Sequence, residues 1–272
     1  MPESNSTQNM AIFCDFENVA LGVRDAKYAA FNIQNVLERL LLKGNIVVKK
    51  AYCDWDRYKE FKAAMHEAAF EMIEIPHVRH SGKNSADIRM VVDALDLCYT
   101  KLHLDTFVII SGDSDFSPLV SKLRENNKVV IGVGVKNSTS DLLTANCDEF
   151  IFYDDLVRDS NRATPGRKKS STKKISKKRT SKKMPSEEEK RKQEALELVA
   201  ATVEDLIQER GVTEKIWGSM VKQTLKRRNP GFSERYHGFR TFNMLLEEAQ
   251  ERNLLVLEAD EKSGGYMIKS AT

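Results

Sequence analysis

The sequence has few of the features that mark disulfide-linked, zinc-binding or membrane-spanning proteins. Its 272 residues include four widely separated cysteines with no C-x-x-C pair, so the spacing of a zinc site or a disulfide framework is missing. No apolar run approaches the ~20 residues of a membrane span, and we expect no membrane partner. The opening MPESNSTQNM lacks the basic and apolar regions of a secretory signal. We therefore expect a cytoplasmic protein, or a nuclear one in a eukaryotic cell.

Several common catalytic motifs are also missing. No G-x-S-x-G and no G-x-x-x-x-G-K-[ST] occurs, so nothing supports a serine hydrolase or a P-loop nucleotide site. The run GVGV at 132–135 lacks the G-x-G-x-x-G pattern of a dinucleotide site and lies inside an expected strand. A phosphatase of the haloacid dehalogenase type would need D-x-D at the first strand, where this chain has D-F-E.

Positive charge is concentrated in one segment. Residues 161–185 contain 11 Lys and Arg and no Asp or Glu, out of 43 basic and 40 acidic residues in the chain. The segment is otherwise rich in Ser and Thr and cannot build a core. We predict a basic disordered linker at 159–187 between domains at 1–158 and 188–272. A flexible polycation attracts nucleic acid regardless of sequence; a solubilising tether and a nuclear address are the alternatives.

Before the linker, apolar runs of strand length alternate with segments of helical periodicity. The expected strands are residues 11–16, 46–55, 70–77, 106–111, 128–135 and 149–154. The expected helical segments are residues 32–44, 58–70, 85–102, 115–127 and 139–147. This alternation predicts an α/β domain with a mostly parallel, Rossmann-like sheet and helices on both faces.

After the linker, three helical patterns precede a hairpin. The helices are expected at 186–211, 214–230 and 236–253, and the hairpin at 254–270 around Gly264 and Gly265. Three helices followed by a terminal hairpin predict a small winged-helix domain.

Acidic residues stand at three places in the first domain. Asp15, Glu17 and Asn18 follow the first strand, and Asp113 and Asp115 follow the fourth strand. Asp87 opens a helix, with Asp93 nearly two turns further on. In open parallel sheets, ligands bind at the carboxyl ends of the strands, near a reversal of strand order. We therefore expect these side chains to meet at one edge of the sheet.

Two interpretations of these acids remain open. Taken singly, Asp87 suits a helix N-terminus, and Asp115 can cap the helix that contains Pro118. Taken together, the acids would repel one another unless a hard divalent cation such as Mg²⁺ or Mn²⁺ bound them. Such a metal activates water and stabilises charge on a phosphate, which indicates phosphodiester hydrolysis. Trp55, at the end of the second strand, is a candidate for stacking on bases, with core packing as the alternative.

Three segments resemble the signatures of a known family. IFCDFENV, GKNSADIRMVVDAL and VIISGDSDFSPLV, in this order and separated by β–α units, resemble the NYN family, a LabA-like branch of the PIN-like ribonucleases. The resemblance covers residues 10–156. It implies that Asp15, Asp87 and Asp113 are catalytic metal ligands for Mg²⁺ or Mn²⁺. It also implies that Asn18 and Asp115 complete or orient the catalytic site.

Two positions differ from this pattern or extend it. The family segment usually reads K-G-x-D, whereas here NSA separates Gly82 and Lys83 from Asp87. We retain Lys83 as a candidate RNA contact. Asp141 lies where PIN-like folds supply a further acid, with helix capping as the alternative.

The C-terminal domain resembles the OST-HTH, or LOTUS, family, through WGSMVKQTLKRRNPGF and HGFRTFNMLLEEA. The resemblance covers about residues 190–270 and implies RNA binding, including guanine-rich RNA, and in some members protein partners. Basic side chains near two helix ends could hold phosphates, although such residues also complement a helix dipole. These candidate RNA contacts are Lys222, Lys226, Arg227, Arg228 and Arg240.

We therefore predict a metal-dependent ribonuclease, endonucleolytic in action, with an RNA-binding C-terminal module. The RNA would be single-stranded or guanine-rich, with single-stranded DNA as the alternative substrate. A non-catalytic RNA-binding adaptor that retains the PIN-like fold is the second hypothesis. A scaffold that binds a protein through the C-terminal module is the third.

Overall fold

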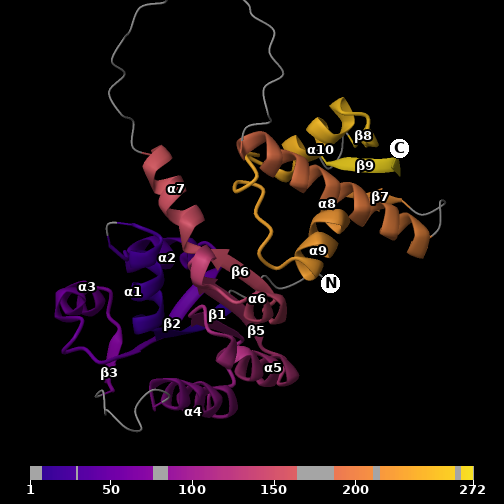
Figure 1. The fold of residues 1–272 in the computed structure, drawn as a ribbon. Coiled ribbons are helices and arrows are strands. Elements are labelled where there is room, and N and C mark those ends of the chain that lie inside the picture. The colour runs from indigo at the N-terminus through magenta and orange to yellow at the C-terminus, as the bar shows by residue number, and fades with distance from the viewer. Residues whose placement is uncertain are drawn as a thin grey trace, which may run out of the picture. The chain divides into compact units, whose positions relative to one another are not determined.

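The chain divides into two compact units, Met1–Asn161 and Arg162–Thr272 (Figure 1). The computed structural model describes residues 8–28, 30–75, 85–163, 187–210, 215–260 and 265–271. Most of the predicted linker, residues 164–186, lies outside the described residues, and residues 159–163 are helical. No helix in the described part of the chain is both long and apolar enough to cross a membrane.

The N-terminal unit is built on six parallel strands. They are β1 (Gln8–Asp15), β2 (Gly44–Cys53), β3 (Glu71–Glu74), β4 (Thr106–Ile110), β5 (Val129–Gly134) and β6 (Glu149–Phe152). Their order in the sheet is β3-β2-β1-β4-β5-β6, so the direction of winding reverses between β1 and β4. The predicted α/β fold is confirmed, and the strand order provides the reversal point at which such sheets bind ligands.

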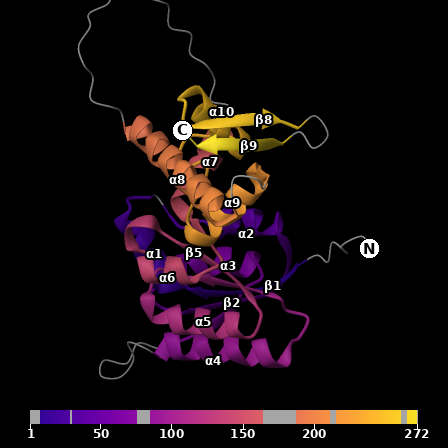
Figure 2. The same cartoon turned by 90° about the vertical axis from the view of Figure 1, so that its right-hand side faces the viewer.

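Helices cover both faces of this sheet (Figures 1 and 2). One face packs against α1 (Phe16–Asp25), α2 (Ile33–Leu41), α3 (Lys62–Glu67) and α7 (Tyr153–Ala163). The other packs against α4 (Ser85–Thr100), α5 (Ser117–Glu125) and α6 (Asp141–Asn146). Short 3₁₀ turns lie at Lys59–Phe61, Ser114–Phe116 and Lys136–Ser138. The side chains of β1 alternate between the two cores, as a strand buried on both faces requires.

Two helices were not predicted from the sequence. Helix α1 begins directly after β1, and the side chain of Asp15 caps it by accepting a hydrogen bond from the amide of Asn18. The helix contains Gly22, a residue more typical of loops than of helices. The glycine is needed at this position because a side chain would collide with Ser138. Helix α7 begins at Tyr153, where the sequence pattern had extended the last strand to residue 154.

The C-terminal unit has the predicted winged-helix arrangement. Its helices are α8 (Glu187–Arg210), α9 (Gly218–Arg228) and α10 (Phe242–Glu251). Its antiparallel sheet contains β7 (Ile216–Trp217), β9 (Tyr266–Ala271) and β8 (Leu255–Ala259), in that order. The expected helix at 214–230 therefore starts only at Gly218, because the two residues before it pair with β9.

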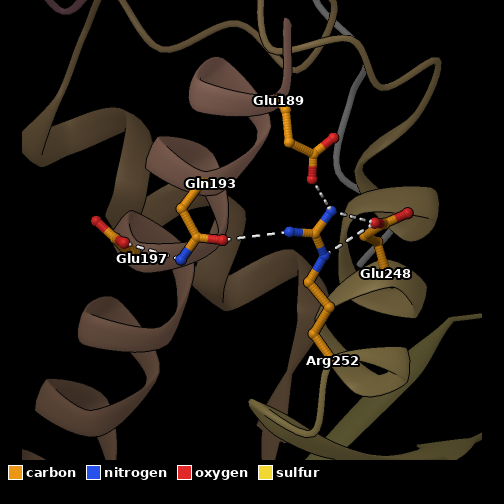
Figure 3. A network of polar contacts seen from close by, with 5 residues as sticks. All are labelled: Glu189, Gln193, Glu197, Glu248 and Arg252. Atoms are coloured by element: carbon orange, nitrogen blue, oxygen red, sulfur yellow. Dashed lines mark hydrogen bonds and ion pairs between the residues drawn. The ribbon is translucent and has the colours of Figure 1, made fainter. Parts of the chain in front are cut away.

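A polar network joins the first and last helices of the C-terminal unit (Figure 3). The guanidinium of Arg252 donates hydrogen bonds to Glu189 at 2.8 Å, to Glu248 at 2.7 Å and to Gln193 at 3.2 Å. The amide of Gln193 in turn donates to Glu197. Glu189 and Glu248 therefore share one cation, which fixes α8 beside α10.

Candidate functional site

A pocket opens where the strand order reverses. It has a volume of about 270 Å³ and lies at the carboxyl ends of β1, β2 and β4 and at the start of α4. Five carboxylates line it, together with the amide of Asn18. They are Asp15, Glu17, Asp54, Asp87 and Asp113. The described lining includes no Lys, Arg or His, so the pocket is strongly acidic.

Hydrogen bonds tie the end of β1 to the turn after β4. The carboxylate of Asp15 accepts from the hydroxyl of Ser111 at 3.0 Å, and that hydroxyl accepts from the amide of Asp113 at 3.2 Å. The side-chain oxygen of Asn18 accepts from the amide of Gly112 at 2.9 Å. The small-residue turn thus serves as a clamp that positions Asp15 and Asp113 relative to each other.

Gly112 is required in this turn by a close approach of the backbone. A side-chain carbon at this position would lie 2.4 Å from the carbonyl oxygen of Ser138, closer than real contacts allow. One residue further, the carboxylate of Asp113 accepts from the amide of Asp115 at 3.0 Å. The three residues of the turn therefore have separate roles. The hydroxyl of Ser111 holds Asp15, Gly112 allows the close approach of Ser138, and the carboxylate of Asp113 holds the amide of Asp115.

The acids of the pocket shift one another's ionisation. Burial, then the charges of Asp87 and Asp113, raise the pKa of Asp15 from its ordinary value of 3.8 to about 7, despite hydrogen bonds that favour its charged form. Burial, followed by the charges of Asp113, Asp115 and Glu17, also raises the pKa of Asp87. Among the residues that the structure describes, neither carboxylate pairs with a cation, which is an arrangement common at functional sites.

The donor set fits a hard divalent cation that keeps part of its water shell. Among the described residues, no three His, Cys, Asp or Glu side chains converge closely enough to form a complete ligand cluster. Magnesium usually binds through one or two carboxylates with several waters, and the pocket offers both acidic oxygens and space. Arg57 pairs with Glu17 at 3.2 Å, and no described Lys, Arg or His lines the pocket beside the other four acids.

Several predicted residues lie outside this pocket. Asp115 is exposed and is not part of the lining, although its charge acts on Asp87. Asp141 is the exposed first residue of α6, and Ser140 caps that helix instead. Lys83 lies outside the described residues.

The prediction that Trp55 stacks on bases is wrong for this structure. Its side chain is 1 % exposed and packs against Phe16, with ring centres 5.0 Å apart. Its indole N–H donates to the carbonyl of Ile73 at 3.2 Å. The ring is part of the core beneath the sheet edge, because β3 and α1 both close over it.

Asp54 and Glu17 are pocket acids that the sequence prediction did not include among the site residues. Asp54 directly follows β2, the strand beside β1, so it reaches the same sheet edge as Asp15. The signal was present in the sequence, since the rule for strand ends applies to every strand next to the reversal point. Glu17, by contrast, was expected at this edge among the acids that follow the first strand, although no role in the site was assigned to it.

The basic residues of the C-terminal unit differ in their surroundings. Lys222 pairs with Glu234 at 2.7 Å, and Arg228 pairs with Asp205. Arg227 and Arg240 are exposed, and Lys226 is half-buried. Lys222 also lines a hollow of about 460 Å³ between α9, α10 and β9, together with Trp217, Ser219, Asn243 and Tyr266.

The fold and the pocket define a class: a PIN-like α/β domain with an acidic site at the reversal point of its sheet. The family model of the NYN domain matches residues 9–154, more than half of the chain. The chain therefore belongs to the NYN family, a PIN-like nuclease family whose members are generally ribonucleases and typically use divalent metals.

Similar proteins match the same region. "Meiosis regulator and mRNA stability factor 1" from Xenopus tropicalis is 26 % identical over 150 residues, and its Bos taurus counterpart 25 %. Both matches cover 55 % of this chain but only 9 % and 8 % of those proteins. A solved structure of a protein of unknown function from Vibrio parahaemolyticus is 27 % identical, with a TM-score of 0.50. It covers 57 % of this chain and 98 % of its own.

Proposed function

We propose that this protein is a metal-dependent ribonuclease that hydrolyses phosphodiester bonds within RNA. The observation that carries the proposal is the pocket of five carboxylates, without Lys, Arg or His in its described lining, at the reversal point of the sheet. Membership of a PIN-like nuclease family supports this chemistry. The two relatives named for mRNA stability support RNA as the substrate class.

Each pocket residue has a proposed role. Asp15, Asp87 and Asp113 would hold Mg²⁺ or Mn²⁺, which supplies an activated water and stabilises charge on the phosphate. Asn18 holds the turn at Gly112 in place and thereby orients Asp113. Asp115 positions Asp113 through its backbone amide and adds negative charge beside Asp87.

We propose that the C-terminal unit is an OST-HTH, or LOTUS, domain that binds RNA and brings it to the pocket. Its hollow offers aromatic rings at Trp217 and Tyr266, an amide at Asn243 and the ammonium of Lys222. Such surfaces suit unpaired bases and phosphates, including guanine-rich RNA. Lys226, Arg227, Arg228 and Arg240 would add sequence-independent attraction to the phosphate backbone.

The proposed location of the protein is the cytoplasm.

The test is cleavage of an internally labelled single-stranded RNA with Mn²⁺, with Mg²⁺ and with chelator. Cleavage should require the metal and should disappear in Asp113→Asn. The matched control is Asp25→Asn, which changes an exposed carboxylate paired with Arg24 at the end of α1. Equal cleavage by wild type and Asp113→Asn would overturn the proposal. A labelled single-stranded DNA of the same sequence tests whether the enzyme prefers RNA.

A non-catalytic RNA-binding adaptor is the second candidate. The observation that favours it is the lack of a complete cluster of three metal-binding side chains among the described residues. In that case RNA would bind with and without metal, and no cleavage product would form. A third candidate, a scaffold for a protein partner at the C-terminal hollow, predicts binding to that partner without RNA and with little salt dependence.

A further inference from the structure

Helix α4 has an apolar surface that no described part of its own unit covers. Its inner face, with Met90, Ala94 and Cys98, is buried against the sheet. A second face of the helix carries large apolar side chains in solvent, where isolated apolar residues are common but continuous stripes are not. These are Ile88 (63 % exposed), Val92 (56 %), Tyr99 (58 %) and, just beyond the helix, Leu102 (84 %).

The spacing of these residues is that of a helix that pairs with another helix. Together with the half-buried Leu95, the stripe runs 88, 92, 95, 99 and 102, which alternates steps of four and three residues. This is the repeat that keeps apolar side chains along one seam of two packed helices. A helix that only covers a sheet needs the inner face alone, so the second stripe calls for a partner. In Figure 1, α4 lies at the lower edge of the N-terminal unit.

Charged residues beside the stripe indicate what the partner is. Arg89 follows Ile88 and Asp96 follows Leu95, so the two charges flank the seam on the same side, seven residues apart. Both are exposed, and Arg89 also contacts Asp93 on its own helix. In an antiparallel pair centred between Val92 and Leu95, Arg89 of each copy faces Asp96 of the other. A two-fold axis thus makes the surface complementary to itself in both shape and charge.

We propose that α4 is the interface of a homodimer, in which two copies of this chain pair their α4 helices antiparallel through this stripe. Ile88 would pack against Tyr99 of the second copy, and Val92 against Leu95. The interface lies beside the acidic pocket, because Asp87 precedes Ile88 in the first turn of α4. It does not depend on the proposed nuclease activity, and its test needs no catalytic readout.

The expected association is weak because one helix on each side buries little surface. Interfaces at this end of the size range are transient, with dissociation constants in the range of roughly 1–100 µM. Sedimentation of the full chain, freed of RNA by high salt, should show the mass rising from one chain to two across that range. A mass that stays at one chain up to ~100 µM would overturn the proposal.

Charge exchange gives the sharper experiment. Asp96→Arg makes positions 89 and 96 both positive, and Arg89→Asp makes both negative. Each variant should remain monomeric on its own, because like charges would then face each other across the interface. Mixed in equal amounts, the two variants should associate, because every cross-helix pair is then opposite in charge. Circular dichroism of each variant checks that Arg89→Asp, placed near Asp93, still folds.

Two further variants separate this interface from any other. Val92→Glu places a charge in the centre of the seam and should reduce dimerisation at least ~10-fold, since charge in a packed apolar interface is costly. Glu38→Arg, an exposed change on α2, is the matched control and should dimerise like wild type. Dimerisation that persists in Val92→Glu would place the interface elsewhere. Failure of the two charge variants to associate when mixed would exclude the antiparallel arrangement.

Discussion

The two units of this protein use acidic residues in opposite ways. In the N-terminal unit, five carboxylates face one pocket whose described lining contains no Lys, Arg or His. In the C-terminal unit, acids meet cations: Glu189 and Glu248 share Arg252, and Glu234 pairs with Lys222. The pKa values reflect this difference. The pKa of Asp15 is raised to about 7, chiefly by burial. Burial also acts to raise the pKa of Glu234, but hydrogen bonds from Lys222 and the backbone, with the charges of Lys222 and Lys226, together lower it.

The difference separates groups that stabilise the fold from groups that reduce its stability. A paired carboxylate favours the folded state, and a buried unpaired one opposes it. Sites that carry such a penalty are usually those that bind something, since the ligand then removes the penalty. The two sets of acids therefore predict different responses to substitution, pH and metal.

The largest difference is expected in catalysis. Asp87→Asn should reduce metal-dependent RNA cleavage by ~100-fold or more, because changes to groups that hold or orient a metal cost at least this much. The matched control is Asp93→Asn, on the same helix. Asp93 is not part of the pocket lining and accepts hydrogen bonds from Tyr52 and Arg89. Initial rates at saturating Mn²⁺ are the measurement. A similar loss in both variants would mean that α4 acts as a whole and that the pocket acid has no special role.

The next difference concerns pH, measured with chelator present. In the unfolded chain Asp15 has its ordinary pKa of 3.8, and in the folded protein its pKa is about 7. Below pH 3.8 it is therefore protonated in the folded and in the unfolded state. The unfolded state releases this proton first, so the contribution of Asp15 to stability should fall as pH rises from about 4 to 7. The loss should amount to roughly 2–4 kcal/mol. Glu234 has the opposite sign: its contribution is present above its ordinary value of 4.5 and decreases as pH falls through its lowered pKa.

Urea unfolding at pH 5 and pH 7.5 measures the contribution of Asp15, because both pH values lie above the range in which Glu234 titrates. Trp55 lies in the N-terminal unit and Trp217 in the C-terminal unit, so Trp217→Phe leaves one fluorescent reporter for the pocket side. In that background, Asp15→Asn should remove most of the pH dependence. An unchanged pH dependence in Asp15→Asn would assign it to another group.

Metal should reverse the penalty in the N-terminal unit alone. A ligand that binds only the folded state adds about 2.7 kcal/mol at 100 times its dissociation constant. Saturating Mn²⁺ should therefore stabilise the unit that Trp55 reports, and Asp15→Asn should abolish most of this gain. Hydrogen exchange in α8 and α10 should not change with Mn²⁺. Equal protection of both units would indicate nonspecific binding to acidic surface.

The acids of the pocket show how far sequence reasoning reaches. Strands β1, β4 and β5 were predictable because their apolar runs are long enough to be buried on both faces. Asp15, Asp87 and Asp113 could be named because they stand directly at strand ends or in a first helical turn. They meet at one edge because of the strand order of the sheet. The local sequence pattern is compatible with several strand orders and does not choose between them.

Other features depend on contacts between distant segments. Whether Trp55 faces solvent or core is decided by β3, which accepts its indole N–H at Ile73 and its amide at Glu74. Neither partner is adjacent in sequence, so the pattern around residue 55 could not distinguish a stacking ring from a buried one. Helix α1 was missed for a similar reason. It contains Gly22, which is needed there because a side chain would collide with the distant Ser138.

The smallest effect is expected at the Arg252 network, where the acids are already paired. Arg252→Ala removes the cation that Glu189 and Glu248 share, but the Arg252 side chain is 30 % exposed, so water offsets part of the loss. The cost should be about 1 kcal/mol, seen as faster hydrogen exchange in α8 and α10. Lys269→Ala, which breaks a more exposed pair with Glu258, is the control and should change exchange less. Cleavage chemistry should be unaffected by Arg252→Ala. If the variant instead lowered cleavage of a short RNA as strongly as Asp87→Asn, the separation between a stabilising and a functional set of acids would be wrong.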